Sequence, residues 1–479
     1  MNARDTFDLI VIGSGPGGYK TAVTAAHLGA RVALIEKSRP GGTCLNQGCI
    51  PKKALIYLAS LIEDVNSLQG RGLKGTTQGD FAGAWRHKEE VIADIRSHFP
   101  LWLRQLGVNM FNGEARFIDS RSVQVTSDDE TQTLHAERII IATGSRPRPH
   151  PVCRHDGEAI IDSADFMRIE DNLPPRLLII GGGAIGVELG YLSHQFGSKV
   201  TIVEQGPRLL NKTEIPLRAS NMLQRKFARL GIGCKLQSTA EQCTQNGNSV
   251  QVTFSDGSTG EYDRVLVAIG REPRTNELDL ERAGIRLDEH GFIPTNEFLE
   301  TSVQGIYAVG DVKEGPMTAN AALHDAKIAA TNAINGNEWA RNYRRVPVVI
   351  DTALEIAAVG LSEDMAETAG FEPDVARANY AGSAKALGRH DAEGFVEVVH
   401  DEETGQMLGG CIVGPEAGEQ IQMLTAACQS PRGLWFLKDI SYSHPSWCEE
   451  LENAVDPYTA EFLQSGKAIF RPGIYAITD

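Results

Sequence analysis

The chain has 479 residues, of which 42% are hydrophobic and 23% are charged, and its formal net charge at pH 7 is −16. A single hydrophobic core rarely serves so long a chain, so the length predicts about three domains. The acidic balance argues against a nucleic-acid surface, which requires clustered Lys and Arg. We find no apolar run of the roughly 20 residues that a membrane helix needs and no signal-peptide profile at the N-terminus, so we expect a cytoplasmic protein with no membrane partner.

An internal repeat is the strongest pattern along the chain. Residues 8–36 run from an apolar strand through a glycine turn and a helix to a second strand, and residues 177–204 repeat this βαβ order. Each turn has the GxGxxG spacing and each second strand ends on an acidic residue; these are Gly13, Gly15, Gly18 and Glu36, then Gly181, Gly183, Gly186 and Glu204. Such a turn lets a pyrophosphate approach backbone N–H groups at a helix N-terminus, and the carboxylate accepts ribose hydroxyls. The repeat therefore predicts two dinucleotide sites.

Later strands complete each unit. Strand-plus-glycine segments recur at 138–148 and 264–274, and a related segment lies at 305–311. The middle unit can be lifted out as an insertion, which predicts one nucleotide-binding domain over 1–150, completed by 280–345, and a second over 151–279. Alternating strands followed by helices over 346–479 predict an α+β domain. The expected fold class is α/β, with two Rossmann-like dinucleotide-binding domains and a C-terminal α+β domain.

Glu204 bears on the choice of cofactor. A carboxylate at this position binds the free 2′-hydroxyl of NAD and repels the 2′-phosphate of NADP. NAD is therefore favoured, although Arg208 follows four residues later in the sequence and would soften the preference if it faced the ribose.

Two of the eight cysteines are near neighbours. Cys44 and Cys49 lie in GGTCLNQGCIPKKAL (41–55), at the expected start of a helix, where the helix N-terminus and the adjacent Lys52 and Lys53 would lower a thiol pKa. The other six have no close partner along the chain; they are Cys153, Cys234, Cys243, Cys411, Cys428 and Cys448. Eight cysteines are too few for a disulfide scaffold, and their spacing predicts no metal site.

Near the C-terminus, His444 is followed five residues later by Glu449. A histidine oriented by a carboxylate is the arrangement expected of a general acid and base for thiols. Taken alone the pair is also compatible with an ordinary surface histidine.

Taken together, these segments resemble the flavoprotein disulfide reductases, and among them the dihydrolipoamide dehydrogenases. The similarity covers nearly the whole chain and is carried by GSGPGGY (13–19), GGTCLNQGCIPKK (41–53), ATGS (142–145), GGGAIGVELG (181–190), AIGREP (268–273), YAVGD (307–311) and HPSWCEE (444–450). The resemblance implies FAD on the first nucleotide-binding domain, NAD on the second, and a homodimer formed through 346–479. It also implies a lipoyl-bearing protein as the partner whose dihydrolipoyl group is oxidised.

The resemblance implies roles for single residues. Substrate sulfur would attack the Cys44 side of a Cys44–Cys49 disulfide, while Cys49 faces the flavin. His444 of the other subunit, held by Glu449, would take the thiol proton. The remaining expected cofactor contacts are Lys53, or its neighbour Lys52, with Glu188 as the partner of the lysine, and Ala115, Thr143, Gly144, Asp311, Ala319 and Gly270.

Some positions depart from the family's pattern. Tyr442 replaces the first histidine of the usual HxHP motif, Ala353-Leu354 precedes Glu355 in place of His-Pro, and the bulk of Trp447 is expected to alter substrate access near His444. Two alternatives therefore stay open: a related NAD(P)H-dependent reductase of a different disulfide, or a redox sensor or scaffold without turnover.

Overall fold

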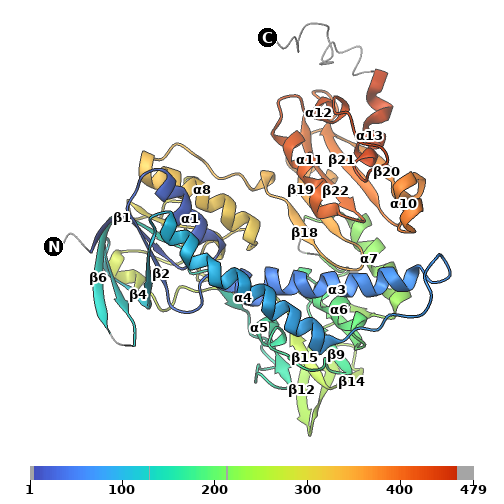
Figure 1. The fold of residues 1–479 in the computed structure, drawn as a ribbon, viewed down its shortest axis with the longest axis horizontal. Helices are drawn as coiled ribbons and strands as arrows, with labels where there is room; N and C mark the ends of the chain where they lie inside the picture. Colours follow the sequence, from blue (N-terminus) through green and yellow to red (C-terminus); the bar gives the residue numbers. More distant parts are fainter. Residues whose placement is uncertain (1–4, 129, 212–213, 461–479) are drawn as a thin grey trace.

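The structure is a computed structural model that describes residues 5–128, 130–211 and 214–460 (Figure 1). The first sheet has the strand order β3-β2-β1-β6-β5-β4, and β17 pairs with β6. Its strands are β1 Thr6–Ile12, β2 Val32–Glu36, β3 Asn109–Asn112, β4 Glu114–Asp119, β5 Ser122–Thr126, β6 Thr131–Ile141 and β17 Ile306–Ala308. Because β17 comes from a distant part of the chain, the sheet joins the N-terminal segment to the segment that follows the middle unit.

The apolar run of β1 is explained by burial on both faces of this sheet. β1 pairs in parallel with β2 on one side and with β6 on the other. Its side chains alternate, so Leu9 and Val11 pack toward α1 (Pro16–His27) and α8 (Ala319–Asn335), whereas Ile10 and Ile12 pack into a separate core beside β4, β5 and β6. Figure 1 shows α1 and α8 side by side on the sheet.

The middle unit repeats the design. Its parallel sheet has the order β11-β10-β9-β15-β8, and the antiparallel sheet β12-β13-β14 packs beside it. The strands are β8 Ile160–Ile161, β9 Arg176–Ile180, β10 Lys199–Glu204, β11 Gly233–Leu236, β12 Ala240–Asn246, β13 Ser249–Phe254, β14 Thr259–Tyr262 and β15 Arg264–Val267, and the helices are α5 Ser163–Phe166, α6 Ala184–Gln195 and α7 Leu217–Leu230. The chain enters and leaves through two short paired strands, β7 Ser145–Pro147 and β16 Arg271–Pro273.

The C-terminal unit is an antiparallel sheet in the order β18-β19-β22-β21-β20, with helices packed against it. The strands are β18 Val348–Ile350, β19 Ile356–Gly360, β20 Pro373–Asn379, β21 Phe395–Asp401 and β22 Met407–Val413, and the helices are α9 Glu363–Thr368, α10 Ala384–Arg389, α11 Ala417–Gln429, α12 Leu434–Lys438 and α13 Glu449–Val455. Short 3-10 turns lie at η1 Leu280–Ala283, η2 Gly310–Val312, η3 Tyr343–Arg345, η4 Tyr380–Gly382 and η5 Asp456–Tyr458.

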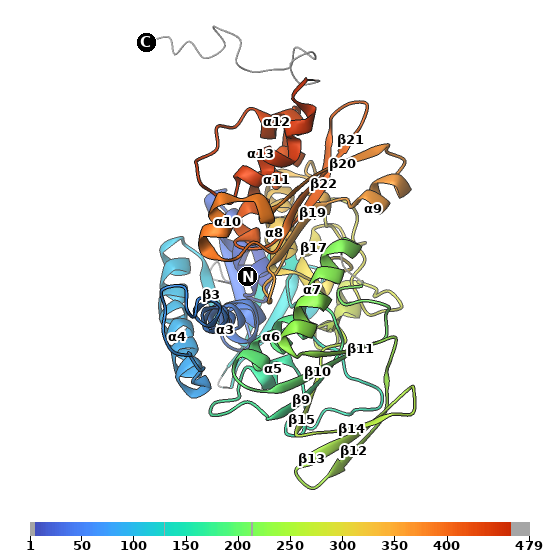
Figure 2. The same ribbon diagram turned by 90° about the vertical axis from the view of Figure 1, so that its right-hand side faces the viewer.

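Three helices place the cysteine motif between these units. α2 (Gly42–Gln47) and α3 (Cys49–Ser67) carry the cysteines, and α4 (Phe81–Gln105) runs beside α3 (Figures 1 and 2). Leu55 and Ala59 of α3 share one hydrophobic core with Val187 of α6 and with Ile350 of β18. A single core therefore connects α3 to both the middle unit and the C-terminal unit.

The predicted fold class is confirmed, because the two βαβ repeats form parallel sheets and the C-terminal segment forms an α+β unit. Cys153 and Cys243 have no close partner along the chain, yet the fold joins them in a disulfide. No helix of the described residues is long and apolar enough to cross a membrane.

Candidate active site

The two neighbouring cysteines lie where one helix ends and the next begins. Cys44 is in α2, Cys49 is the first residue of α3, and Gly48 between them breaks the helical path. Both thiols are free and half-buried. A hydrogen bond from the Cys44 thiol lowers the pKa of Cys49 to about 7, with a further contribution from Lys52, and the same contact raises the pKa of Cys44. Cys49 is therefore the thiolate of the reduced pair near neutral pH.

An ion pair beside Cys49 connects three parts of the chain. Lys52 of α3 pairs with Glu188 of α6, which is 1% exposed, and the other carboxylate oxygen of Glu188 accepts the N–H of Asp351 at 3.2 Å. Burial lowers the pKa of Lys52, but Glu188, together with Cys49 and Asp351, more than offsets this effect, so the pKa of Lys52 is raised and the side chain is charged. The sequence reasoning favoured Lys53 as the partner of Glu188. The structure instead pairs Lys53 with Asp351 at 2.5 Å and leaves half of the Lys53 side chain exposed.

The first glycine turn leaves no room for side chains. A Cβ atom at Gly18 would collide with the carbonyl oxygen of Gly13, so helix α1 can pack this closely on β1 only with glycine at that position. A Cβ atom at Gly42 would lie 2.6 Å from the Cα atom of Gly15. The segment that carries Cys44 therefore lies directly against the turn at the N-terminus of α1.

Glu36 lies at the end of β2 beside this turn. Its carboxylate accepts the Ser14 N–H at 3.0 Å and the Ser14 hydroxyl at 2.6 Å, and the Gly41 N–H donates to the same hydroxyl oxygen. Ala115 lies close by on β4, two residues after Gly113, whose N–H donates to the Glu36 carbonyl oxygen. The backbone of Glu36 therefore contacts the turn that leads into β4, and the cofactor contacts expected of Glu36 and Ala115 stay predictions.

Asp311 of the first nucleotide-binding unit forms a polar cluster with Ser145 and Arg271. The Ser145 hydroxyl donates to the Asp311 carboxylate at 2.6 Å, and the Arg271 Nε donates to the Ser145 oxygen at 2.6 Å and lies 3.8 Å from Asp311. Ser145 and Arg271 were missed by the sequence reasoning. Their signal was the matching position of ATGS and AIGREP in the two strand-plus-glycine segments.

The neighbouring predicted residues are held by backbone contacts. The Thr143 hydroxyl donates to the Arg274 carbonyl oxygen at 2.7 Å, and the Gly144 carbonyl oxygen accepts the Arg274 N–H. No atom lies within 4 Å of the position that a Cβ atom on Gly144 would occupy. Ala319 is the first residue of α8, whose N-terminus is capped by the Thr318 hydroxyl.

The second glycine turn reproduces the first. A Cβ atom at Gly186 would collide with the carbonyl oxygen of Gly181, Gly183 caps the N-terminus of α6, and the space above Gly183 and Gly270 is open. The Glu204 carboxylate accepts the Gly182 and Gly206 N–H groups, each at 2.7 Å. Both turns therefore have the form that admits a pyrophosphate next to a ribose-binding carboxylate.

Arg208 is turned away from that carboxylate. Its guanidinium donates to the Ile215 carbonyl oxygen at 2.9 Å, and burial lowers its pKa.

His444 and Glu449 form the predicted pair. His444 Nδ1 lies 2.6 Å from the Glu449 carboxylate, which also accepts the Ser446 N–H at 2.5 Å. These bonds lower the pKa of Glu449, and the His444 side chain is 76% exposed. Figures 1 and 2 show α13, which begins at Glu449, at the end of the C-terminal unit and well away from α3. One chain therefore does not bring this pair to Cys44 and Cys49.

Trp447 does not line an opening in this chain. It is 7% exposed, its ring meets Tyr380 edge-on at 5.7 Å, and Lys385 and Arg389 lie over it at 5.8 and 5.7 Å. Trp447 packs in the core beneath the segment that carries His444. This position does not support the expectation that the bulk of Trp447 directly alters substrate access. Tyr442 is likewise part-buried, and its hydroxyl donates to the Leu437 carbonyl oxygen at 3.0 Å.

Lys52→Met is expected to raise the pKa of the Cys49 thiol by about one pH unit, because the nearby cation favours the thiolate and Glu188 would remain as an uncompensated anion. The rate at which iodoacetamide alkylates Cys49 in the reduced protein, followed against pH by peptide mass spectrometry, measures this pKa. Lys53→Met is the matched control, since Lys53 pairs with Asp351 and the Cys49 pKa is shifted by Lys52 and Glu188 instead. Equal shifts in the two variants would show that the role given to Lys52 is wrong.

Proteins of similar sequence match this chain over nearly its whole length. A dihydrolipoyl dehydrogenase from Thermus scotoductus is 38% identical over 460 residues, which cover 94% of this chain and 97% of the relative. The dihydrolipoyl dehydrogenase from Geobacillus stearothermophilus is 34% identical and covers 92% of this chain and 93% of the relative.

Solved structures of similar proteins have the same fold. LpdA from Mycobacterium tuberculosis superposes with a TM-score of 0.88 at 27% identity, over 94% of this chain and 99% of the other. The HOCl-induced flavoprotein disulfide reductase RclA from Escherichia coli, in its Cu(II) complex, gives 0.84 at 29% identity, over 95% and 100%.

Two family matches divide the chain in the same order. Residues 7–326 match the pyridine nucleotide-disulphide oxidoreductases, and residues 346–455 match the dimerisation domain of those enzymes. The chain belongs to the pyridine nucleotide-disulphide oxidoreductase family.

Proposed function

We propose that this protein is an FAD-dependent dihydrolipoyl dehydrogenase, which oxidises protein-bound dihydrolipoyl groups with NAD through the Cys44 and Cys49 pair. One observation carries the proposal: a thiol pair with a Cys49 pKa of about 7 lies against the glycine turn of the first nucleotide-binding unit. The relatives named dihydrolipoyl dehydrogenase supply the substrate class, since they match nearly the whole chain.

The residues of the first unit fit FAD. The turn at Gly13, Gly15 and Gly18 would hold the pyrophosphate, Glu36 the ribose of the adenosine, and Asp311 the ribityl or phosphate oxygens. Ala115 and Ala319 would add backbone contacts. When bound, FAD supplies the acceptor that connects two-electron oxidation of a dithiol to reduction of NAD. The equivalent turn of the second unit, with Glu204, would hold NAD.

Cys44 and Cys49 have different roles in the proposed reaction. In the oxidised pair, a substrate thiolate attacks the Cys44 sulfur and Cys49 leaves as a thiolate, because the Lys52 charge and the N-terminus of α3 stabilise the Cys49 thiolate. A second substrate thiolate then displaces Cys44 and closes the oxidised substrate ring. Lys52 stabilises the Cys49 thiolate while it persists.

His444 would take the proton of the substrate thiol, since thiolate is the competent nucleophile. Glu449 would orient the ring and stabilise its protonated form. Because the pair lies far from the cysteines of its own chain, we propose that His444 of a second copy completes each site in a homodimer. The match to the dimerisation domain supports this assembly.

We also propose the domain boundaries 1–150 with 280–345, 151–279, and 346–479. The strands support these boundaries. All strands of the sheet that contains β1 fall within 1–150 and 280–345, and all strands of the sheet that contains β9 fall within 151–279. The cytoplasmic location remains part of the proposal.

A redox sensor or scaffold without turnover is the less favoured function. Such a protein needs no base, whereas the His444 and Glu449 pair is fully formed and exposed. Formation of NADH from NAD and free dihydrolipoamide tests the choice, and absence of turnover in the FAD-loaded dimer would favour the sensor.

Cys49→Ser is expected to abolish the long-wavelength charge-transfer absorbance of the reduced, FAD-loaded enzyme, because that variant lacks the thiolate that faces the flavin. Cys44→Ser should show the band before any reductant is added, because its Cys49 is a free thiolate beside oxidised FAD, and dithionite should bleach the band by reducing the flavin. Absorbance spectra during titration with dithionite provide the measurement. A band that survives in Cys49→Ser and is lost in Cys44→Ser would reverse the two roles.

The enzyme should prefer NAD to NADP by at least about tenfold in kcat/KM, because the Glu204 carboxylate repels a 2′-phosphate and ~1.4 kcal/mol corresponds to that factor. Steady-state assays with both cofactors measure the preference. Glu204→Ala should reduce it, while Arg208→Ala, which removes a guanidinium turned away from the site, should leave it unchanged. Equal efficiency of the wild type with both cofactors would contradict this assignment.

Mixing two inactive variants tests the shared site. Homodimers of Cys49→Ser and of His444→Ala should both be inactive. After subunit exchange, half of the dimers are mixed and each has one intact site of two, so about a quarter of the wild-type activity should return. Failure to recover activity, although mixed dimers are present by mass spectrometry, would show that each chain supplies its own base.

A further inference from the structure

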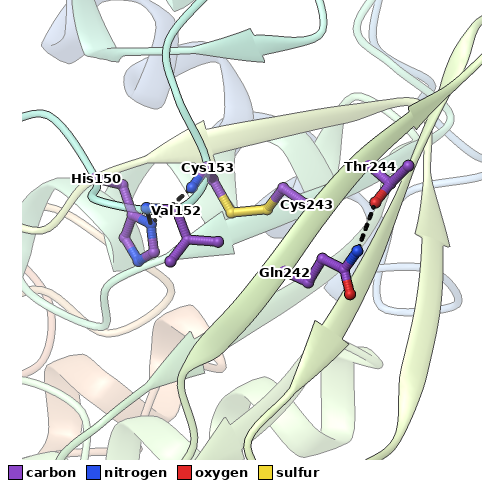
Figure 3. Close-up of a disulfide and its surroundings, with 6 residues drawn as sticks. All are labelled: His150, Val152, Cys153, Gln242, Cys243 and Thr244. Carbon is purple, nitrogen blue, oxygen red and sulfur yellow. Dashed lines mark hydrogen bonds between the residues drawn. A yellow bond between two sulfur atoms is a disulfide. The ribbon is translucent and has the colours of Figure 1, made fainter.

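A second pair of cysteines lies outside the site described above. Cys153 and Cys243 are bonded to each other, with a Cα to Cα distance of 5.1 Å and a sequence separation of 90 residues (Figure 3). Neither residue is close to Cys44 or Cys49 in sequence, and the proposed reaction does not use them. We propose that Cys153 and Cys243 form a reversible redox site that locks the segment by which the chain enters the NAD-binding unit.

Cys153 is the inward anchor of that segment. Residues 149–158 have no helix or strand, and Cys153 is the buried residue among them, with 0% exposure. The His150 ring accepts the N–H groups of Val152 and Cys153, at 3.2 and 3.0 Å, which turns the Cys153 side chain toward the sheet (Figure 3). Without the bond to Cys243, this irregular stretch would lose its covalent link to β12.

Cys243 supplies the other end from strand β12. β12 is an edge strand of the sheet β12-β13-β14, and Cys243 pairs with Val252 of β13. Gln242 and Thr244 flank it and hydrogen-bond to each other at 3.2 Å (Figure 3). Cys153 lies in one hydrophobic core with Val250 and Val252, and Cys243 packs against that core. The disulfide thus attaches the segment 149–158 to the sheet β12-β13-β14.

The locked segment begins at the crossing between the two nucleotide-binding units. The Arg148 N–H donates to the Gly270 carbonyl oxygen at 3.0 Å, and the Arg148 guanidinium donates to the Arg271 carbonyl oxygen. Arg271 in turn binds Ser145, which donates to Asp311. Opening the disulfide would therefore release a segment that directly follows Arg148, which contacts Gly270 and Arg271 at that crossing.

The two sulfurs differ in access, which gives the reaction a direction. Cys243 is part-exposed and Cys153 is fully buried, so a dithiol thiolate would attack the Cys243 sulfur and release Cys153 as a thiol. The second thiol of the reagent then displaces Cys243 and forms a cyclic disulfide. Closure is the reverse: the two cysteines lose two electrons and two protons to a small disulfide, which becomes two thiols. In the proposed cytoplasmic setting, disulfides are mostly catalytic or redox-sensing.

The chemistry is tested in a Cys44→Ser/Cys49→Ser background, which removes the other pair. Folded protein is incubated with oxidised glutathione and then with dithiothreitol, alkylated with iodoacetamide and analysed by peptide mass spectrometry. We expect a peptide linked through Cys153 and Cys243 after oxidation, and two alkylated thiols after reduction. If both thiols stay free under oxidised glutathione, the pair only fills space in the core. If dithiothreitol cannot reduce the disulfide in the folded protein, the bond is permanent. Either result overturns the proposal.

The lock itself is tested by hydrogen exchange, which needs no turnover and so does not depend on the proposed activity. Amide exchange in 149–158 should be at least about tenfold faster in the reduced protein than in the oxidised protein, because local opening no longer has to work against the bond. Cys153→Ser/Cys243→Ser should match the reduced wild type in both redox conditions. Cys234→Ser is the matched control, since Cys234 is a free, part-buried thiol on β11 of the same unit. Exchange that is equal in the oxidised and reduced wild type would show that the disulfide locks nothing.

Discussion

The buried ion pair between Lys52 and Glu188 is the contact on which the position of the active-site thiol depends. Lys52 lies one helical turn after Cys49, and Glu188 is 1% exposed at the centre of α6. Removing one member of a buried pair typically costs about 3–5 kcal/mol, because the other charge is left without a partner in a low dielectric. Since Glu188 also accepts the Asp351 N–H, this one carboxylate holds together α3, the middle unit and the start of the C-terminal unit.

The same pair determines the electrostatics of the thiols. A Cys49 thiolate in this half-buried position needs a cation close by, and Lys52 supplies it while Glu188 limits its effect. The Cys44 thiol donates a hydrogen bond to the thiolate, so the two sulfurs are chemically distinct before any substrate arrives. In the proposed reaction of the oxidised pair, where Cys44 has no thiol proton, the charge of Lys52 is what remains to favour the departure of Cys49.

The two nucleotide-binding units show one backbone design adapted to two roles. In each, a glycine without room for a Cβ atom lets a helix pack against the turn, and a carboxylate at the end of the next strand faces the turn's N–H groups. The differences lie around this shared design. The first unit has the cysteine segment packed against its turn through Gly42, whereas the second has open space above Gly183 and Gly270.

The sequence by itself determined the features that depend on neighbours along the chain. The apolar runs, the GxGxxG turns, Glu36 and Glu204, and the Cys44 and Cys49 pair follow from local periodicity and spacing, so the fold class and the chemistry could be predicted. Only the tertiary structure decided that Lys52 takes Glu188 while Lys53 takes Asp351, that Trp447 is buried, and that Cys153 bonds to Cys243. Adjacent lysines on a helix point in directions about 100° apart, so the choice between them depends on where another unit packs. Likewise, cysteines separated by 90 residues meet because two segments pack on one core, and contacts at that separation leave no local pattern in the sequence.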